Sequence, residues 1–357
     1  MNYKELIKAD CKFFKGDIPC RPHKTYGYKC SDCPKYLFSD GIILIIKLAA
    51  IGDVIRTTPL VTKLKIEHPN SKIWWLTYTP EIIASGLVDR VLTFSQEDII
   101  TLRAHKFQKI INLDKDIQAS SLSSLLEADQ KFGFILNNNV ISPVNEFAEH
   151  KYMTGVFDDL NKANTKSYLE EIFEICGYNF SGEEYILDCD TSFVFSELAN
   201  KTNIIGLNTG CGDRWVSRLW SEANWIKLIQ MLENSGYTTL LLGGKSEDDR
   251  NKRLAFATGA MYLGCFPLGQ FISLMNNCNT IVSAVTMGMH IAIALKKNLI
   301  LMNNIFNPNE FELYGRGEII SPEKECTCYF SASCKNTDYF CMDYIKPETI
   351  FEAIKKY

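Results

Sequence analysis

The sequence predicts an α/β fold made of two halves, each built on a parallel sheet. Short apolar runs alternate with helical segments through most of the chain, as in βαβ units. A glycine-bearing turn follows an apolar run in each half, at 47–59 and again at 208–215. The chain has 357 residues, of which 46% are hydrophobic and 22% charged, which suits two globular domains.

Composition and charge exclude several classes of protein. The formal net charge of -4 provides no overall attraction for nucleic acid. No run of about 18 apolar residues occurs, so we expect no transmembrane helix. Residues 1–8 are polar and charged and lack the apolar centre of a signal peptide. We therefore expect a cytoplasmic protein that does not bind nucleic acid.

Residues 1–40 form a polar, cysteine-rich segment with little periodicity. It contains Cys11, Cys20, Cys30 and Cys33. Cys30 and Cys33 are spaced as C-x-x-C, so their thiolates can bind one tetrahedral metal ion, and the other two cysteines can complete the shell. Because so polar a segment buries little apolar surface, a structural zinc or iron ion would supply folding free energy. The alternative is a loose arm with reduced thiols.

The first α/β domain is expected at 41–190. Its predicted strands are 42–46, 73–77, 91–94 and 110–113. Its predicted helices are 59–67, 80–85, 119–128 and 168–176. The acidic and irregular residues 181–202 are interpreted as the crossing to the second domain.

The turn at 47–59 is the most informative part of the first domain. Gly52 allows the backbone to turn closely, and the first N–H groups of the following helix favour an anion. Asp53 lies at the carboxyl end of a strand, which makes it a candidate general base. The alternative is that Asp53 caps the helix. Asp114 and Asp116 follow another strand and read as a helix start or as catalytic carboxylates.

The second α/β domain is expected at 203–345, and the chain closes on a helix within 346–357. Its predicted strands are 204–207, 238–242, 262–263, 280–282 and 299–302. Its predicted helices are 221–235, one that opens at 245–250, 268–276 and 291–295, with Ser221 as an N-cap. Turns of the kind that bind phosphate are predicted at 208–218 and 283–290.

A second cysteine cluster follows the second sheet. It consists of Cys326, Cys328, Cys334 and Cys341. Four cysteines within sixteen residues are a candidate site for zinc or iron. The alternative is a thiol-rich loop without metal.

Three motifs carry a resemblance to a known family across nearly the whole chain after residue 40. They are LAAIGDV (48–54) with TTP (57–59), IGLNTG (205–210) with RLW (218–220) and LLGG (241–244), and SAVTMGMH (283–290). In this order and spacing they resemble glycosyltransferase family 9, the ADP-heptose:lipopolysaccharide heptosyltransferases. The resemblance implies the GT-B fold, in which two Rossmann-like domains face a cleft.

The resemblance also implies roles for individual residues. The N-terminal half would hold the acceptor, and Asp53 would be the base that deprotonates the acceptor hydroxyl. The C-terminal half would hold a donor of the ADP-heptose type. The implied contacts are Thr209, Gly210 and Arg218 with the diphosphate, Glu247 with the ribose, and Thr286 and His290 near the phosphates. Transfer would invert the anomeric carbon and require no catalytic metal.

The implied function is transfer of a heptose or related sugar to a hydroxyl of a bacterial surface glycan of the lipopolysaccharide core type. The protein would work in the cytoplasm, in peripheral contact with the inner membrane. The cysteine clusters loosely resemble those of the autotransporter heptosyltransferases, which hold iron and glycosylate protein hydroxyls. A protein acceptor is therefore an alternative. Val285 stands where family members usually carry Asp. This departure leaves a third reading open, a non-catalytic, metal-organised protein that binds sugar nucleotides.

Overall fold

The computed structural model describes residues 6–212 and 214–357, and their contacts divide the chain into two compact units. Unit 1 comprises Met1–Ala49, Thr57–His150 and Ile172–Asn179, and unit 2 comprises Ala50–Arg56, Lys151–Glu171 and Phe180–Tyr357. Three segments that the sequence analysis places in the first domain thus group with unit 2, namely Ala50–Arg56, Lys151–Glu171 and residues 180–190. Residues 1–5 of the predicted cysteine-rich segment and Asp213 of the predicted turn lie outside the described residues.

Unit 1 is built on a mostly parallel sheet with the strand order β3-β2-β1-β4-β5-β6. Its strands are β1 (Ile42–Ile46), β2 (Lys72–Leu76), β3 (Arg90–Leu92), β4 (Lys106–Asn112), β5 (Glu127–Asn137) and β6 (Val140–Pro143). Only the β5–β6 pair in this described sheet is antiparallel. Strand β1 reads as a continuous apolar run because helices cover both faces of a parallel sheet.

Helical segments precede, connect and follow these strands. They are α2 (Arg21–Tyr26) before β1, then α4 (Pro59–Glu67), η1 (Pro80–Ile82), α5 (Gln96–Arg103) and α6 (Ile117–Leu125) between strands, and η2 (Glu146–Ala148) after β6. The division into units falls within two further helices, α7 (Glu149–Val156) and α9 (Tyr168–Ile175). Each of them has residues in both units. Buried side chains of β1, β2, β4, α5 and α6 form one hydrophobic cluster, with Phe107 and Leu102 at its centre.

Three predictions about secondary structure are wrong in detail. The predicted helix 119–128 ends at Leu125, and the extended, buried Leu126 leads directly into β5, which the sequence analysis missed. The predicted helix 80–85 is only the 3-10 turn η1, since Gly86 at φ 73° reverses the chain soon after it. The predicted strand 262–263 is replaced by an isolated bridge between Leu240 and Met261.

Asp114 and Asp116 have structural roles in unit 1. Asp116 is the N-cap of α6 and accepts a hydrogen bond from the Ala119 N–H at 2.8 Å. Asp114 is buried, forms an ion pair with Lys47 and accepts from the Leu48 N–H at 2.5 Å. Burial raises the pKa of Asp114, although Lys47 opposes the shift. The contacts support the helix-start interpretation for Asp116, whereas the carboxylate of Asp114 is bound to Lys47 and Leu48 instead.

Unit 2 is built on a parallel sheet with the strand order β11-β10-β9-β7-β8. Its strands are β7 (Ile204–Asn208), β8 (Thr238–Leu242), β9 (Thr280–Ala284), β10 (Asn298–Met302) and β11 (Gly317–Ile320). Its α-helices are α3 (Ile51–Ile55), α8 (Asp158–Ala163), α10 (Glu222–Asn234), α11 (Asp248–Thr258), α12 (Leu268–Asn276), α13 (Met287–Ala294) and α14 (Pro347–Ile354). Its 3-10 turns are η3 (Ser196–Leu198), η4 (Val216–Arg218), η5 (Lys245–Glu247), η6 (Pro308–Glu310) and η7 (Cys341–Tyr344).

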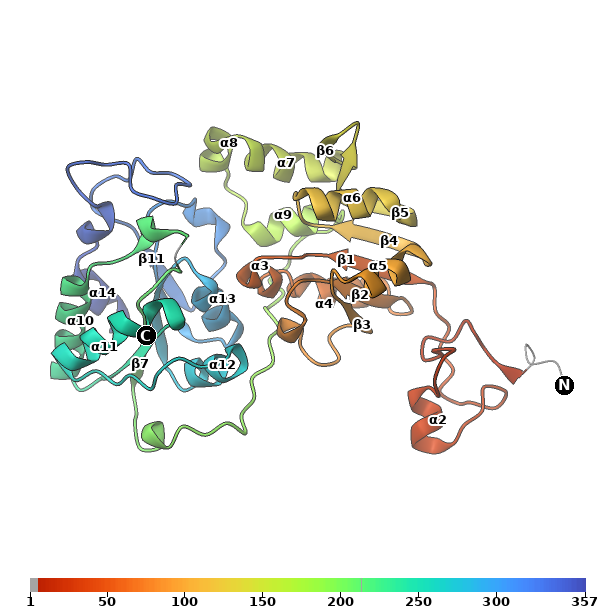
Figure 1. Ribbon diagram of the computed structural model, residues 1–357, viewed down its shortest axis with the longest axis horizontal. Helices are drawn as coiled ribbons and strands as arrows, with labels where there is room; N and C mark the ends of the chain where they lie inside the picture. The colour runs from red at the N-terminus through yellow and green to blue at the C-terminus, as the bar shows by residue number, and fades with distance from the viewer. Residues whose placement is uncertain (1–5, 213) are drawn as a thin grey trace. The chain divides into compact units, whose positions relative to one another are not determined.

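The helices of unit 2 form two layers around the sheet, with α10, α11 and α14 on one face and α12 and α13 on the other (Figure 1). Trp220 and Trp225 meet edge to face at 4.8 Å in the core beneath α10. The predicted N-cap Ser221 is confirmed, because its hydroxyl accepts from the Asn224 N–H. The two mostly parallel sheets confirm the predicted α/β class. Within the described residues, every helix is too short or too polar to span a bilayer.

Candidate active site

Unit 2 contains a pocket of about 580 Å³ at the carboxyl ends of β7 and β9. These strands are neighbours in a parallel sheet, so the turns that follow them meet at one edge, where α/β proteins bind ligands. The volume lies within the usual range for small-molecule sites. Of the predicted site residues, six line this pocket: Asp53, Gly210, Arg218, Glu247, Thr286 and His290.

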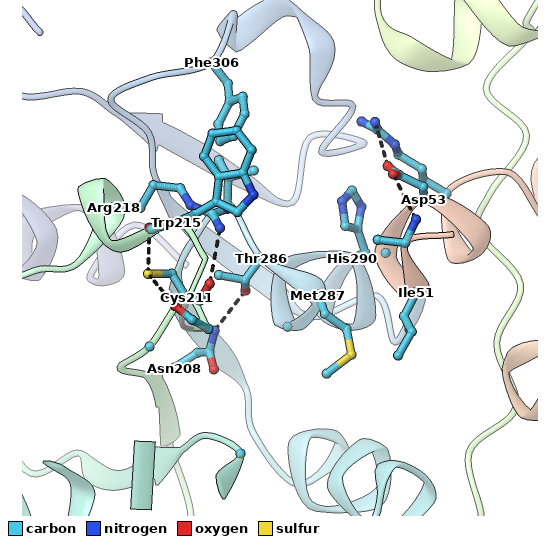
Figure 2. Close-up of a pocket in the computed structure, with 18 of the residues that line it drawn as sticks. Ile51, Asp53, Asn208, Cys211, Trp215, Arg218, Thr286, Met287, His290 and Phe306 are labelled. Atoms are coloured by element: carbon cyan, nitrogen blue, oxygen red, sulfur yellow. Dashed lines mark hydrogen bonds and ion pairs between the residues drawn. The ribbon is translucent and has the colours of Figure 1, made fainter. Parts of the chain in front are cut away.

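Arg218 is a buried cation of the pocket wall and is only 8% exposed. It ends η4, and its NH2 group donates to the Cys211 carbonyl at 3.2 Å. Its guanidinium carbon lies 5.6 Å from the Trp215 ring centre and 5.5 Å from that of Phe306. Figure 2 shows the Arg218 side chain together with those of Trp215 and Phe306. Burial lowers the pKa of Arg218 to about 10, so it stays charged at neutral pH. No carboxylate among the described residues pairs with it, and its buried Nε has no partner there.

The N-terminus of α13 faces the same pocket. Thr286 is the N-cap residue, and Thr286, Met287 and Gly288 all line the pocket. The Asn208 side chain at the end of β7 donates to Thr286 Oγ1 at 3.0 Å and to Ser283 Oγ at 2.9 Å. The first N–H groups of a helix and its dipole favour an anion. Asn208 therefore fixes the turn that presents this helix end.

The turn after β7 packs against Glu247. A Cβ built on Gly210 would overlap the Glu247 carboxylate, so the close approach requires glycine there. Glu247 accepts from the Gly244 N–H at 2.9 Å and the Gly212 N–H at 3.3 Å. Thr209 lies beneath the turn, with its hydroxyl 2.5 Å from Asn251 Oδ1. It is buried and is the one predicted donor residue that does not line the pocket.

Asp53 lies in α3 and faces the pocket with 32% of its side chain exposed. Its Oδ2 accepts from the Ala50 N–H at 3.3 Å, so the capping interpretation holds in part. Its Oδ1 lies 2.8 Å from the NH2 group of Arg56. Figure 2 marks the contacts of the Asp53 carboxylate with dashed lines. The NH1 group of Arg56 donates to Glu310 Oε1 at 2.8 Å. Burial alone would lower the pKa of Arg56, but Asp53 and Glu310 raise it above its usual value.

His290 is buried on α13 beneath α3. A Cβ on Gly52 would overlap its imidazole, so Gly52 serves the contact between these helices. The ring stacks on Tyr185 with 6.2 Å between ring centres. Burial and the nearby Arg56 lower the pKa of His290 to about 3. The imidazole is therefore neutral at physiological pH and adds no positive charge for a phosphate.

Several pocket residues were not singled out from the sequence. Trp215, Phe306 and Phe330 form an aromatic wall with ring centres 5.2 to 5.8 Å apart. They come from three separate loops, and no local pattern links them. Arg56 and Glu310 were also missed. The spacing of three residues between Asp53 and Arg56, which brings opposite charges together on a helix, could have found the first of these.

Both cysteine clusters consist of free thiols. Cys11, Cys20, Cys30 and Cys33 line a small cavity of about 20 Å³. In the second cluster, Cys328 Sγ lies 3.8 Å from Cys334 Sγ and accepts from the Lys335 N–H at 3.0 Å. In the part of the chain that the structure describes, no group of three or more His, Cys, Asp or Glu residues is arranged to hold a metal ion.

Comparison with known proteins decides the family. The sequence model of "Glycosyltransferase family 9 (heptosyltransferase)" matches residues 99–340. The chain belongs to this family. The family membership agrees with the enzyme class predicted from the three motifs, a glycosyltransferase.

Individual relatives are distant. The chain is 24% identical over 227 residues to "Lipopolysaccharide heptosyltransferase 3" of Escherichia coli (strain K12), covering 56% of this chain and 62% of that protein. The glycosyl transferase family 9 structure from Veillonella parvula DSM 2008 superposes with a TM-score of 0.69 at 17% identity, covering 89% and 97% of the two chains.

A second similar structure is an iron-containing dodecameric heptosyltransferase, TibC of enterotoxigenic E. coli H10407, in complex with ADP-D-beta-D-heptose. The TM-score is 0.59 at 14% identity, with 90% and 76% of the two chains covered. Structures this dissimilar in sequence show the fold alone. They confirm the predicted GT-B fold class for this chain.

Proposed function

We propose that this protein is an inverting glycosyltransferase that moves a heptose or a related sugar from a nucleoside-diphosphate donor to a hydroxyl of a bacterial surface glycan. One observation carries the proposal. Arg218 is a buried cation without a carboxylate partner among the described residues, and it shares a pocket with the carboxylate of Asp53. A pocket with an unmatched cation requires an anionic ligand, and a donor diphosphate supplies that charge.

The donor diphosphate binds between Arg218 and the N-terminus of α13. The guanidinium and the N–H groups near Thr286 and Gly288 neutralise the charge that grows on the departing nucleoside diphosphate. The aromatic wall of Trp215, Phe306 and Phe330 supplies apolar contact area beside the guanidinium. Glu247, already fixed by two backbone N–H groups, is the proposed contact for the donor ribose.

Asp53 is the proposed general base. Its carboxylate takes the proton of the acceptor hydroxyl while that oxygen attacks the anomeric carbon from the face opposite the diphosphate. The bond from the anomeric carbon to the diphosphate oxygen breaks, and the electron pair leaves with the nucleoside diphosphate. One displacement inverts the anomeric carbon. This mechanism requires no metal ion.

A donor screen tests the function. The purified protein is incubated with ADP-, GDP-, UDP- and dTDP-sugars, ADP-heptose among them, and with a lipopolysaccharide core acceptor. Mass spectrometry then measures the nucleotide released and the mass of the product. We expect release with one nucleotide class and a product heavier by one sugar residue. Absence of both turnover and any nucleotide-induced rise in melting temperature would remove the transferase proposal and favour the non-catalytic alternative.

The acceptor is tested separately, because the cysteine clusters also loosely resemble those of the autotransporter heptosyltransferases, and that resemblance implies a protein acceptor. The same incubation is repeated with candidate protein acceptors, and each product is digested and analysed by mass. We propose that the acceptor is a glycan. We also propose that the protein works in the cytoplasm, at the surface of the inner membrane. A sugar found on serine or threonine of a protein, with none on the glycan, would replace the acceptor in this proposal.

We also propose that each cysteine cluster binds a structural zinc or iron ion. Cys326, Cys328, Cys334 and Cys341 would hold one ion. Its fit rests on the 3.8 Å between Cys328 and Cys334, which matches two sulfurs on a tetrahedral ion with bonds of about 2.3 Å. The N–H of Lys335 on Cys328 Sγ stabilises a thiolate. The ion would cross-link the loop.

The second site would consist of Cys11, Cys20, Cys30 and Cys33, which already converge on one small cavity. An ion bound there would cross-link the segment and stabilise it directly. Elemental analysis of protein purified without chelator tests both sites. We expect about two ions per chain, about one in a Cys30→Ser/Cys33→Ser variant and about one in a Cys328→Ser/Cys334→Ser variant. Less than about 0.2 ion per wild-type chain would contradict both sites.

A further inference from the structure

Arg56 connects three segments of unit 2 around Asp53. It caps the C-terminus of α3 and pairs with Asp53 on that helix and with Glu310 on η6. Its guanidinium carbon lies 3.5 Å from the Tyr168 ring centre at the start of α9. A planar guanidinium that is stacked on a ring and bonded at both ends has little freedom left. The Asp53 oxygen bound to it is held as firmly.

Glu310 is itself held in place by its loop. Asn307, the N-cap of η6, accepts from the Asn309 N–H at 3.0 Å. The Asn307 amide donates to the carbonyls of Asn161 and Asn164, at 2.7 Å each. These bonds fix η6 to the end of α8, and so fix the carboxylate that binds Arg56.

The other titratable groups named near this cluster are either neutral at physiological pH or paired with an opposite charge of their own. Tyr168 stacks under the guanidinium, and the buried Tyr185 has a pKa raised well above its usual value by burial. His290 is neutral at physiological pH because its pKa is about 3. Lys151 lies over the Tyr168 ring at 5.0 Å and forms an ion pair with Glu171. Arg56 pairs directly with Asp53, and Glu310 pairs with Arg56, so these two charges both bear on the Asp53 carboxylate.

We propose that Arg56 and Glu310 are positioning residues for Asp53. Arg56 holds one oxygen of the base, and Glu310 holds Arg56 and takes up part of its positive charge. A base paired with a cation of its own would be oriented but weakened, since the cation stabilises the carboxylate. Sharing the cation with a second carboxylate keeps the orientation and restores basicity. The assignment of a base to Asp53 rests on the proposed function, whereas the shared cation rests on geometry alone.

The two substitutions change Asp53 in opposite directions. Glu310→Gln leaves Arg56 to Asp53 alone, so the pKa of Asp53 should fall by about one unit. Arg56→Met removes the cation and leaves two carboxylates as neighbours, so the pKa should rise by about one to three units. A residue that merely supported the fold would not produce shifts of opposite sign. Arg56→Lys keeps the charge without the planar fork and should give an intermediate shift.

The experiment is a titration of protein labelled with ¹³C at aspartate Cγ, followed by NMR, with Asp53 identified by its loss in Asp53→Asn. Wild type, Glu310→Gln, Arg56→Lys and Arg56→Met are compared. Arg316 and Glu184 form a matched ion pair of 2.7 Å in unit 2 that does not line the pocket. Arg316→Met and Glu184→Gln are therefore the controls, and the Asp53 titration should not move in either.

The same variants are assayed for the pH dependence of kcat/KM, whose acidic limb should follow the Asp53 shift while KM for the donor changes less than about twofold. An unchanged Asp53 titration in a folded Glu310→Gln protein would overturn the positioning role. Arg56→Lys provides the second test if Arg56→Met fails to fold. Shifts as expected without turnover on any donor would leave the positioning role and refute the proposed function. Turnover without any shift in the Asp53 titration would support the proposed function and refute the positioning role.

Discussion

Arg56 and Arg218 line the same pocket, and their partners differ. Arg56 has two carboxylates within 2.8 Å and an aromatic ring under its guanidinium. Arg218 has aromatic neighbours and a backbone carbonyl, and no described carboxylate pairs with it. Their pKa values move accordingly. Burial lowers the pKa of Arg218, whereas the carboxylates of Arg56 outweigh burial and raise its pKa.

This difference separates two uses of a buried cation. A cation with its counter-charges in place stabilises the protein and fixes the geometry around it. A cation without a counter-charge destabilises the empty protein, and its free energy is recovered when an anion binds. We interpret Arg56 as a residue that holds Asp53 in position. We interpret Arg218 as the group that binds the donor. Substitutions at the two ends of the pocket test this distinction.

The largest expected effect comes from Asp53, the group held by Arg56. Asp53→Asn keeps the size of the side chain and removes the base, so turnover should fall by about 10²–10⁴-fold. Binding of the nucleoside diphosphate should change less than about threefold, because the proposed contact of the diphosphate is Arg218. Turnover is measured by nucleotide release and binding by calorimetry. Retained turnover would remove Asp53 from the role of base.

Arg56→Met should destabilise the protein. It leaves Asp53 and Glu310 close together without their cation, at a cost of about 2–3 kcal/mol after allowance for their partial exposure. The melting temperature should fall accordingly. Arg316→Met breaks the more exposed pair with Glu184 and should cost less than about 1 kcal/mol. Equal losses in the two variants would contradict the special place of Arg56.

His290 lies near Arg56, and its lowered pKa should make the stability of the protein depend on pH. Its pKa is about 3 in the folded protein, below the value of 6.5 in an unfolded chain. Between these values the unfolded chain binds the extra proton, so the free energy of unfolding should fall as pH falls. The slope from this one group is about 1.4 kcal/mol per pH unit below pH 6.5. His290→Gln should lack this component in melting curves from pH 7 to 5, whereas His23→Gln should retain it.

Arg218→Met should have the smallest effect on the empty protein, and in the opposite direction to Arg56→Met. It removes a buried charge without a described carboxylate partner, so the stability of the unliganded protein should stay unchanged or rise by up to about 1 kcal/mol. Melting temperature without nucleotide is the measurement. A fall similar to that of Arg56→Met would show that Arg218 has a structural counter-charge and would erase the contrast between the two residues.

Much of the fold was predictable because it depends on local pattern. The runs at β1, β8 and α12 are apolar and bounded by turn residues, and their predicted limits agree with the observed bounds. Strand β5 was missed because its first residues, which include Glu127 and Asp129, are largely polar. They show no apolar alternation that would distinguish a strand from a continuation of the preceding helix. A strand of this kind is fixed by pairing with β4, which sequence does not display.

The site was predictable in part for the same reason. Glycine turns after strands and the family motifs led to Asp53, Arg218 and Thr286, which line the pocket. Glu310 was not predictable, since it lies 254 residues from Arg56 along the chain and meets it only in the folded unit. Thr209 belongs to a correctly predicted turn, but the twist of that turn places its hydroxyl against Asn251. Which side chains of a turn face a ligand depends on packing beneath the turn.

The contrast between the two arginines is tested most directly by calorimetric binding of one nucleoside diphosphate to wild type, Arg218→Met and Arg56→Lys. The ligand is whichever of ADP, GDP, UDP and dTDP raises the wild-type melting temperature most. A hydrogen bond to a charged group contributes about 1.5–3 kcal/mol. We therefore expect Arg218→Met to bind the nucleoside diphosphate at least about tenfold more weakly. Arg56→Lys should bind within about threefold of wild type. Wild-type affinity in Arg218→Met, or an equal loss in both variants, would contradict the account.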